Sequence, residues 1–134
     1  MSPDATPGFL LVWNPTYATI AAPAAAGAGP VVGDWSTVNR RIAAGDRLYL
    51  VRVAVGPRGV VGRGHALDRP HPEADGRHYV PVAWDELSPD APLLDLAALR
   101  AGVPGYNWTP QASGATLRPP ALAFLGGALG DGAP

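Results

Sequence analysis

The sequence predicts a small α+β domain, built on a curved sheet or barrel with short helices at its ends. Residues 8–13 and 47–55 are nearly continuous apolar runs, the pattern of strands that are buried on both faces. Short segments over residues 93–100 and 119–125 have helical spacing or a proline-containing start, which favours helices. Together these elements indicate one sheet with few and peripheral helices.

The N-terminal part of the chain predicts one strand and one short helix. Gly8–Trp13 is the strand, and Asn14-Pro15 ends it because proline cannot donate to a ladder. Thr16 is suited to cap a helix over residues 16–26. Residues 24–30 are rich in alanine and glycine and predict a loop.

The centre of the chain predicts a hairpin preceded by an irregular segment. Residues 35–42 lack strand alternation and predict a short helical or turn segment. Residues 47–55 form the clearest strand, residues 56–59 a hairpin connection, and residues 60–66 the partner strand. Two glycines inside this partner strand indicate a bulge, a bend or close approach by another backbone.

The C-terminal half predicts one more strand and two helices. His78–Trp84 is the strand, and Pro81 within it favours an edge position. An amphipathic helix is expected over residues 93–100, a turn-rich loop over 105–114, and a closing helix that begins at Pro119.

The chain of 134 residues predicts a single domain over residues 8–127, with a flexible N-terminus (1–7) and a flexible tail (128–134). The absence of cysteine excludes a disulfide framework, a thiolate nucleophile and every cysteine-containing zinc site. No apolar stretch reaches about 18 residues, and no secretion signal is recognisable. We therefore expect a cytoplasmic protein without a membrane partner.

Positive charge is concentrated in the middle of a chain whose net charge is −1. Six arginines stand against one acid, Asp46, between residues 35 and 67. Such a basic belt on a near-neutral protein suits phosphate contacts from one face, and the alternative is an ordinary solvated hairpin surface. Arg52 lies inside an otherwise apolar strand, so we expect it to pair with a carboxylate or to open onto a cavity.

The three histidines could in principle form a metal site with nearby acids, and they are the only candidates for general-base chemistry by histidine. His65, His71 and His78 lie near acidic residues, but their spacing matches no helical metal-binding pair. No nucleophile elbow or phosphate-cradling glycine loop accompanies them. We therefore expect no metal, no cofactor and no enzymatic activity. A small metal-dependent hydrolase that uses these histidines is retained as an alternative.

Three of the four tryptophans stand beside polar, turn-forming residues. These are Trp13, Trp35 and Trp108. Burial in a core is the plain interpretation, because tryptophan contributes a large apolar area to packing. The alternative is a cage that stacks on a flat ring while neighbouring amide and hydroxyl groups bond the edge of that ring.

Several short motifs stand in a fixed order along the chain. They are Trp13-Asn14-Pro15, Gly33-Asp34-Trp35-Ser36, Asn39-Arg40-Arg41-Ile42, Ala44-Gly45-Asp46-Arg47-Leu48-Tyr49-Leu50-Val51-Arg52, Pro57-Arg58-Gly59-Val60-Val61-Gly62-Arg63-Gly64, Pro92-Leu93-Leu94 and Asn107-Trp108-Thr109-Pro110-Gln111-Ala112-Ser113-Gly114. This ordered set resembles EVE-type domains of the PUA-like superfamily, over roughly residues 8–127. It is similar to the sensor module at the N-terminus of some bacterial modification-dependent HNH endonucleases and McrB-like restriction proteins.

The resemblance implies a small PUA-like β-barrel with peripheral helices that recognises a modified base flipped out of the duplex. Related domains bind methylated or hydroxymethylated cytosine in DNA, and YTH relatives bind methylated adenine in RNA. The base-binding residues that it implies are Trp13, Asn14, Trp35, Ser36, Trp108 and Thr109. Beside them it places Asn39, Arg40 and Arg41 as phosphate contacts, to which the basic belt adds Arg52, Arg58 and Arg63.

The expected function is thus a non-enzymatic reader of a modified base, with modified cytosine in double-stranded DNA as the expected ligand. It would serve as the sensor of a restriction or defence system, and since no HNH nuclease sequence is present, cleavage would belong to a separate nuclease or have been lost. This chain has Tyr17 where such modules often carry a second tryptophan, and His71-Pro72 where they often have His-Trp. Two further functions stay open: an RNA-binding PUA-like module, and a protein-interaction scaffold whose tryptophans are core residues.

Overall fold

The computed structural model of the chain describes residues 6–17 and 31–129. The loop expected over residues 24–30 lies outside the described residues, as does nearly all of the helix expected over 16–26. Thr16 and Tyr17 are described, and they belong to a turn that follows the first strand.

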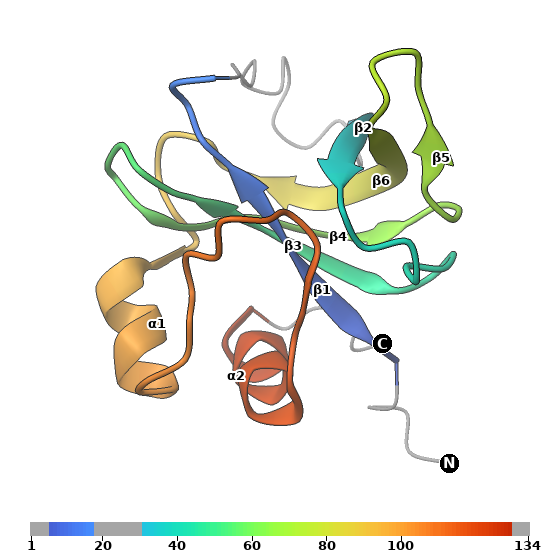
Figure 1. The fold of residues 1–134 in the computed structure, drawn as a ribbon. Helices are drawn as coiled ribbons and strands as arrows, with labels where there is room; N and C mark the ends of the chain where they lie inside the picture. Colours follow the sequence, from blue (N-terminus) through green and yellow to red (C-terminus); the bar gives the residue numbers. More distant parts are fainter. Residues whose placement is uncertain (1–5, 18–30, 130–134) are drawn as a thin grey trace.

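Strands of the described chain form one mixed sheet that is curled into a half-barrel (Figure 1). Its main path runs β2-β6-β4-β3-β1-β8, and β1 pairs with β3 in parallel while the other pairs are antiparallel. The path comprises β1 (Gly8–Trp13), β2 (Val31–Thr37), β3 (Arg47–Arg52), β4 (Gly59–Ala66), β6 (His78–Leu87) and β8 (Ala115–Thr116). Two short strands join at its sides, β5 (His71–Pro72) to β6 and β7 (Leu94–Asp95) to β4.

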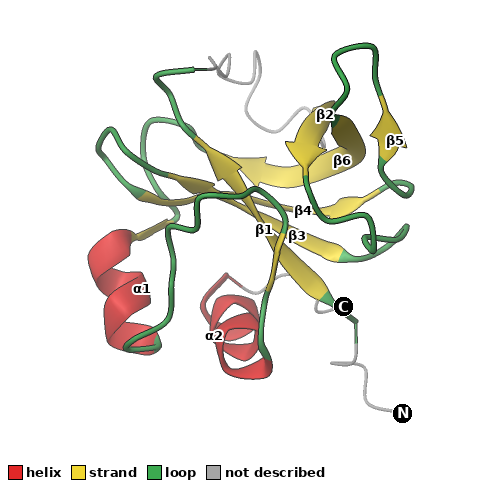
Figure 2. Cartoon of the chain, viewed as in Figure 1, coloured by secondary structure: helices red, strands yellow, loops and turns green. Residues whose placement is uncertain are grey.

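Two helices lie on the same side of the sheet, α1 (Leu96–Gly102) and α2 (Pro119–Leu129) (Figure 2). The side chain of Asp95 caps α1 by accepting a hydrogen bond from the Ala98 N–H at 2.8 Å. Neither helix of the described chain has the length and apolar character needed to span a membrane. The sequence therefore predicted the coarse architecture, a small curved sheet with two short peripheral helices.

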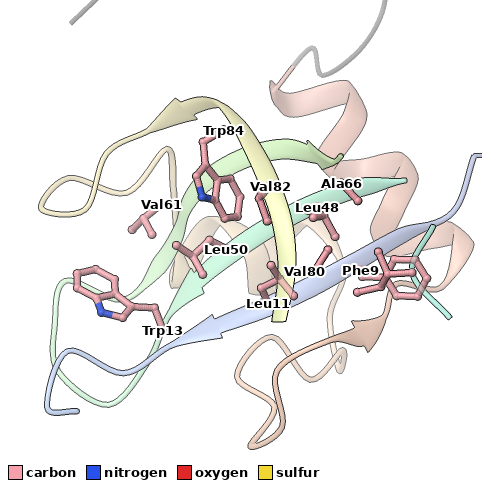
Figure 3. Close-up of a cluster of buried hydrophobic side chains, with 11 residues drawn as sticks. Phe9, Leu11, Trp13, Leu48, Leu50, Val61, Ala66, Val80, Val82 and Trp84 are labelled. Carbon is pink, nitrogen blue, oxygen red and sulfur yellow. The ribbon is translucent and has the colours of Figure 1, made fainter. Parts of the chain in front are cut away.

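Both faces of the sheet are buried, which explains the continuous apolar runs of β1 and β3. Along β1, Phe9 and Leu11 lie on the concave face of the sheet (Figure 3). Leu10 lies on the opposite face, where it packs with residues of the helices. The inner core consists of Phe9, Leu11, Trp13, Ile42, Leu48, Leu50, Val61, Ala66, Val80, Val82 and Trp84. The outer core, on the helix side, consists of Leu10, Tyr49, Val51, Val60, Leu96, Leu99, Trp108, Leu117, Ala121, Leu122 and Leu125.

The expected bulge or close approach in the fourth strand is confirmed. The pairing of β4 with β6 shifts register between Arg63 and Gly64. A Cβ atom at Gly64 would lie 2.1 Å from the carbonyl oxygen of Ala83, so β6 crosses this point too closely for any side chain. The glycine thus allows the sheet to bend into its curl.

Two expectations about strands are wrong. Residues 35–37 belong to strand β2, not to a helical or turn segment. β2 pairs only with β6 among the described strands and is largely exposed, so it shows no apolar alternation. Pro81 is not at a sheet edge, because β6 lies between β2 and β4. It falls where the pairing of β6 with β4 has ended at Val82 and the pairing with β5 has not begun, so its missing N–H costs no ladder bond.

Contacts of the fold extend to both ends of the described chain. The closing helix continues through Gly126 and Gly127 to Leu129, which packs against the outer core. At the other end, the carbonyl of Pro7 accepts the Arg47 N–H and so ties residue 7 to β3.

The two ends of the curled sheet are joined by hydrogen bonds. The indole Nε1 of Trp35 on β2 donates to the carbonyl of Val12 on β1 at 3.1 Å. The segment before β8 closes the same gap, since the carbonyl of Ser113 accepts the Val38 N–H at 2.9 Å and its hydroxyl accepts the Val12 N–H at 3.0 Å. We call these contacts the closure.

Gly114 is part of the closure and should tolerate no side chain. It has a φ of 103°, and a Cβ there would lie 2.1 Å from Thr37 Oγ1. We expect Gly114→Ala to lower the free energy of unfolding by about 3 kcal/mol or more, through backbone strain and a clash. Gly105→Ala is the matched control, because its φ of 79° is similar and its Cβ would meet nothing. It should cost only about 1–2 kcal/mol. Equal losses in urea unfolding would contradict the steric role of Gly114.

Candidate functional site

An open cleft of about 990 Å³ lies beside the closure, where the ends of β1 and β2 meet the 109–113 loop and the turn before β6. Five of the six residues expected to bind a base line it. They are Trp13, Asn14, Trp35, Ser36 and Thr109. Sequence positions almost 100 residues apart are thus brought to one place, because β1 receives the loop before β8 as its neighbour.

Two tryptophans, Trp13 and Trp35, line the cleft, one buried beneath it and the other partly exposed at its side. Trp13 is only 4% exposed and belongs to the inner core (Figure 3), so among the lining residues it provides the floor of the cleft. The guanidinium of Arg52 lies 5.2 Å from the centre of the Trp13 ring, a cation–π contact that holds it in place. Trp35 packs against the inner core but keeps part of its surface exposed, so it provides the wall.

Trp108 does not contribute to the cleft, and the expected cage of three indoles is therefore wrong. Its side chain is 2% exposed and lies in the outer core. The ring centres of Tyr106 and Phe124 are 4.7 Å and 6.4 Å from its own. The neighbouring Thr109 does reach the cleft, so the chain turns between these two residues and separates a core indole from a lining hydroxyl.

Several polar groups of the cleft are not used by the fold. The Oδ1 of Asn14 accepts the Thr16 N–H at 2.9 Å, which shapes the turn after β1 and leaves the side-chain NH2 group available. Within residues 6–17 and 31–129, no hydrogen bond engages the Ser36 hydroxyl or the Gln111 amide. These groups can therefore bond the edge of a ligand.

The expected phosphate contacts divide into those near the cleft and those elsewhere. Arg40 is exposed and lines the cleft, and Arg41 is exposed beside it. Arg63 is paired with Glu86 across β4 and β6 at 3.0 Å, and Arg58 lies exposed in the β3–β4 connection. Neither Arg58 nor Arg63 lines the cleft.

Arg52 is a structural residue, so its expected contact with phosphate is wrong. Its side chain is buried and donates to the carbonyls of Val55, Gly56 and Pro89, each at 3.0 Å. The exposed carboxylate of Asp90 lies 3.8 Å away. A buried guanidinium must be satisfied by hydrogen bonds, and here backbone carbonyls satisfy it without a cavity.

Asn39 also serves the fold. Its side-chain NH2 donates to the Gly114 carbonyl at 3.0 Å, and its Oδ1 accepts the Arg41 N–H at 2.9 Å. The NH2 group also donates to the Thr116 hydroxyl at 3.3 Å. The side chain therefore holds the segment before β8 and the turn that carries Arg40, and these three contacts commit it to the fold instead of to phosphate.

The three histidines lie in different surroundings. His65 is 3.8 Å from Asp85, and His71 is 2.9 Å from Glu73, while His78 lines the cleft. In the part of the chain that the structure describes, no three His, Asp or Glu side chains come close enough together to hold a metal ion. The small metal-dependent hydrolase stays an alternative interpretation of the sequence.

Sequence reasoning missed several lining residues. The turn before β6 contributes Arg77 and His78, and the turn after β1 contributes Tyr17. Asp75-Gly76 is a recognisable turn signal ahead of a strand, so the turn itself could have been found. Its position near Trp35 could not, because it depends on the antiparallel pairing of β2 with β6.

The turn before β6 is held by one strong side-chain contact. The Tyr79 hydroxyl donates to Asp75 Oδ2, and Asp75 Oδ1 accepts the Arg77 N–H at 2.9 Å. The hydrogen bond from Tyr79, followed by that from Arg77, lowers the pKa of Asp75, and the same bond to Asp75 raises the pKa of Tyr79. Asp75 therefore stabilises the fold above its ordinary pKa and loses this effect as the pH falls, whereas Tyr79 stabilises it below its ordinary pKa and loses the effect as the pH rises.

The Tyr79→Phe variant tests this contact. Loss of the hydroxyl should raise the pKa of Asp75 toward its ordinary value, because the largest cause of the lowered pKa is removed. The carboxyl carbon of Asp75, followed by NMR through an acid titration, reports this pKa directly. An unchanged midpoint in the variant would show that the hydrogen bond is not made in solution.

No protein-family model, no curated protein and no solved structure matches this chain. The resemblance to EVE-type domains therefore stays a prediction, and the cleft is the basis on which a function can be inferred.

Proposed function

We propose that this chain is a non-enzymatic reader of a modified nucleobase, which binds in the cleft after leaving its stack. The observation that carries the proposal is the meeting of Trp35 and Trp13 with uncommitted polar groups and Arg40 in one open cleft. A nucleotide is bound through an aromatic face that stacks on its base, hydrogen bonds to the edge of that base, and a cation near its phosphate. Residues of all three kinds line this cleft.

Stacking supplies the main gain in this proposal. A base stacked on an aromatic side chain is worth about 1–3 kcal/mol, and extraction of a base from a duplex costs a few kcal/mol. Trp35 alone therefore offsets only part of the cost, and edge bonds from groups such as Ser36 and Asn14 must supply the rest. A mismatched or unpaired base would be the easiest to capture.

The modified base is distinguished from the unmodified one by how its added group fits the cleft. One added methyl or hydroxymethyl group contributes about 1–3 kcal/mol of discrimination in a pocket. We propose modified cytosine in double-stranded DNA as the ligand and a PUA-like, EVE-type domain as the fold family, in keeping with the curled sheet and its two helices. In this proposal the chain is the sensor of a restriction or defence system, and a separate nuclease cleaves.

A binding screen tests the proposed function. Fluorescently labelled duplexes and single strands of DNA and RNA, which differ only in methylation of one cytosine or adenine, are titrated with the protein. We expect the methylcytosine duplex to bind about 5- to 150-fold more tightly than its unmodified match. Equal affinity for every modified and unmodified pair would contradict the proposal, and preference for a modified RNA would identify an RNA-binding module instead.

Substitutions at Trp35 locate the binding in the cleft. Trp35→Ala should abolish the preference for the modified duplex because it removes the stacking wall. Trp35→Phe is the matched variant, since it loses the Nε1 bond to Val12 but keeps an aromatic face. It should retain most of the preference. If both variants, shown to be folded by circular dichroism, bind as the unaltered protein does, the cleft is not the site.

The salt dependence of binding identifies the phosphate contacts. Each lost phosphate contact should reduce the slope of log K against log salt by about 0.9. We expect this change in Arg40→Gln, which alters a residue of the cleft, and no change in Arg58→Gln, which alters an exposed arginine outside it. The reverse result would place the nucleic acid on the β3–β4 hairpin instead of on the cleft.

A further inference from the structure

The most exposed large apolar side chains of the described chain gather at the rim of the cleft. Tyr17 is 85% exposed and Val38 is 70% exposed, and both line the cleft. The other exposed large apolar residues, Val32, Val55 and Leu67, are less exposed than Val38 and lie outside it. Single exposed apolar residues are ordinary on a protein surface, but two of them beside one open cleft indicate a place that a ligand covers.

Tyr17 is presented by an ordered turn directly after β1. The Asn14 carbonyl accepts the Tyr17 N–H at 3.0 Å, and the Asn14 side chain accepts the Thr16 N–H at 2.9 Å. The backbone at Tyr17 is therefore positioned by the strand that carries Trp13, the floor of the cleft. The phenol ring belongs to neither core, so packing of this ring does not stabilise the fold.

Val38 approaches the cleft from the other strand end. It follows β2 directly, and its N–H is fixed by the Ser113 carbonyl at 2.9 Å. Arg40, which lines the same cleft, stands two residues later. The rim of the cleft thus carries the aromatic ring of Tyr17 after β1, the aliphatic side chain of Val38 after β2, and the cation of Arg40 two residues after Val38 in the chain.

The cleft is also large for a single base. Its volume of about 990 Å³ lies at the upper end of the range, about 300–1,000 Å³, in which pockets for drug-sized ligands fall. A cleft of this size has room for more than the one base that Trp35 and Trp13 would contact.

We propose that Tyr17 and Val38 form a second subsite, which stacks the base adjacent to the modified one. This inference rests on the proposed function, since it assigns the neighbour of the base that Trp35 binds. The full site then takes a strand segment of at least two unpaired nucleotides, either in single-stranded DNA or in a duplex that has opened at the modified base and its neighbour. The modified base lies on Trp35, the neighbouring base on Tyr17 and the intervening phosphate within reach of Arg40.

The second subsite has a consequence for strand preference. Inside a duplex the neighbour of a flipped base stays paired and stacked, so it reaches Tyr17 only if a second pair opens at further cost. An unpaired strand has no such cost, and aromatic stacking accepts any neighbouring base because every base has a π-face. The protein should therefore bind a single strand more tightly than a duplex that carries the same modification.

The test is a length and strand series with the intact chain. The probes are methyldeoxycytidine monophosphate, a methyldeoxycytidine–thymidine dinucleotide, and one methylcytosine ten-mer as a single strand and as a duplex, each titrated by calorimetry. We expect Tyr17→Ala to weaken the dinucleotide and the single strand about 5- to 150-fold, to leave the mononucleotide unchanged, and to remove the preference for the single strand.

Two variants act as controls. Tyr17→Phe keeps the aromatic face and should bind like the unaltered protein, whereas Val55→Ala shortens an exposed apolar side chain outside the cleft and should have no effect. Because Tyr17 belongs to neither core, Tyr17→Ala should unfold at the same urea concentration as the unaltered protein.

The outcomes separate the inference from the proposed function. If Trp35→Ala weakens every probe and Tyr17→Ala weakens none, the second subsite is wrong and the base reader stands. If Tyr17→Ala weakens the mononucleotide as strongly as the dinucleotide, Tyr17 belongs to the first subsite and the inference is overturned. If the unaltered protein binds none of the probes, both are overturned.

Discussion

Hydrogen bonds that join the ends of β1 and β2, one of them direct and the others through Ser113, bring together the elements that line the cleft. The Trp35 indole reaches the Val12 carbonyl, and Ser113 bonds the backbone of both Val12 and Val38. These contacts bring the end of β1, the end of β2 and the 109–113 loop to one place. Side chains and one glycine-containing segment make the closure, and the cleft lies beside it.

Some of the aromatic and cationic side chains stabilise the fold, and others are exposed in the cleft where a ligand can contact them. Trp84 and Trp108 are core residues, Trp13 is fixed under Arg52, and Trp35 alone combines a structural hydrogen bond with an exposed face. Arg52 donates to backbone carbonyls and Arg63 pairs with Glu86, whereas Arg40 and Arg77 line the cleft. A chain with a net charge of −1 can therefore still offer a positive rim.

Sequence patterns predicted those elements that depend on local chemistry. Runs of apolar residues identified β1 and β3, and proline at the start identified α2, because both faces of the sheet and the first helical turn impose clear residue preferences. The strand β2 was missed because its one partner among the described strands leaves it mostly exposed. The cleft was predicted in part, since Trp13, Trp35 and Thr109 do meet. The structural roles of Trp108 and Arg52 could not be predicted, because the sequence around a buried indole or guanidinium can contain the same polar neighbours as the sequence around one in a binding site.

Contact between a base and Trp35 is tested most directly by the four indole N–H signals, which report on each tryptophan separately. In a proton–nitrogen NMR titration with a methylcytosine oligonucleotide, the Trp35 signal should shift most, with a smaller change at Trp13 below it. Trp108, which lies in the outer core, should not move. Shifts confined to Trp108, or an unmoved Trp35 at saturation, would contradict the central claim that this cleft receives the base.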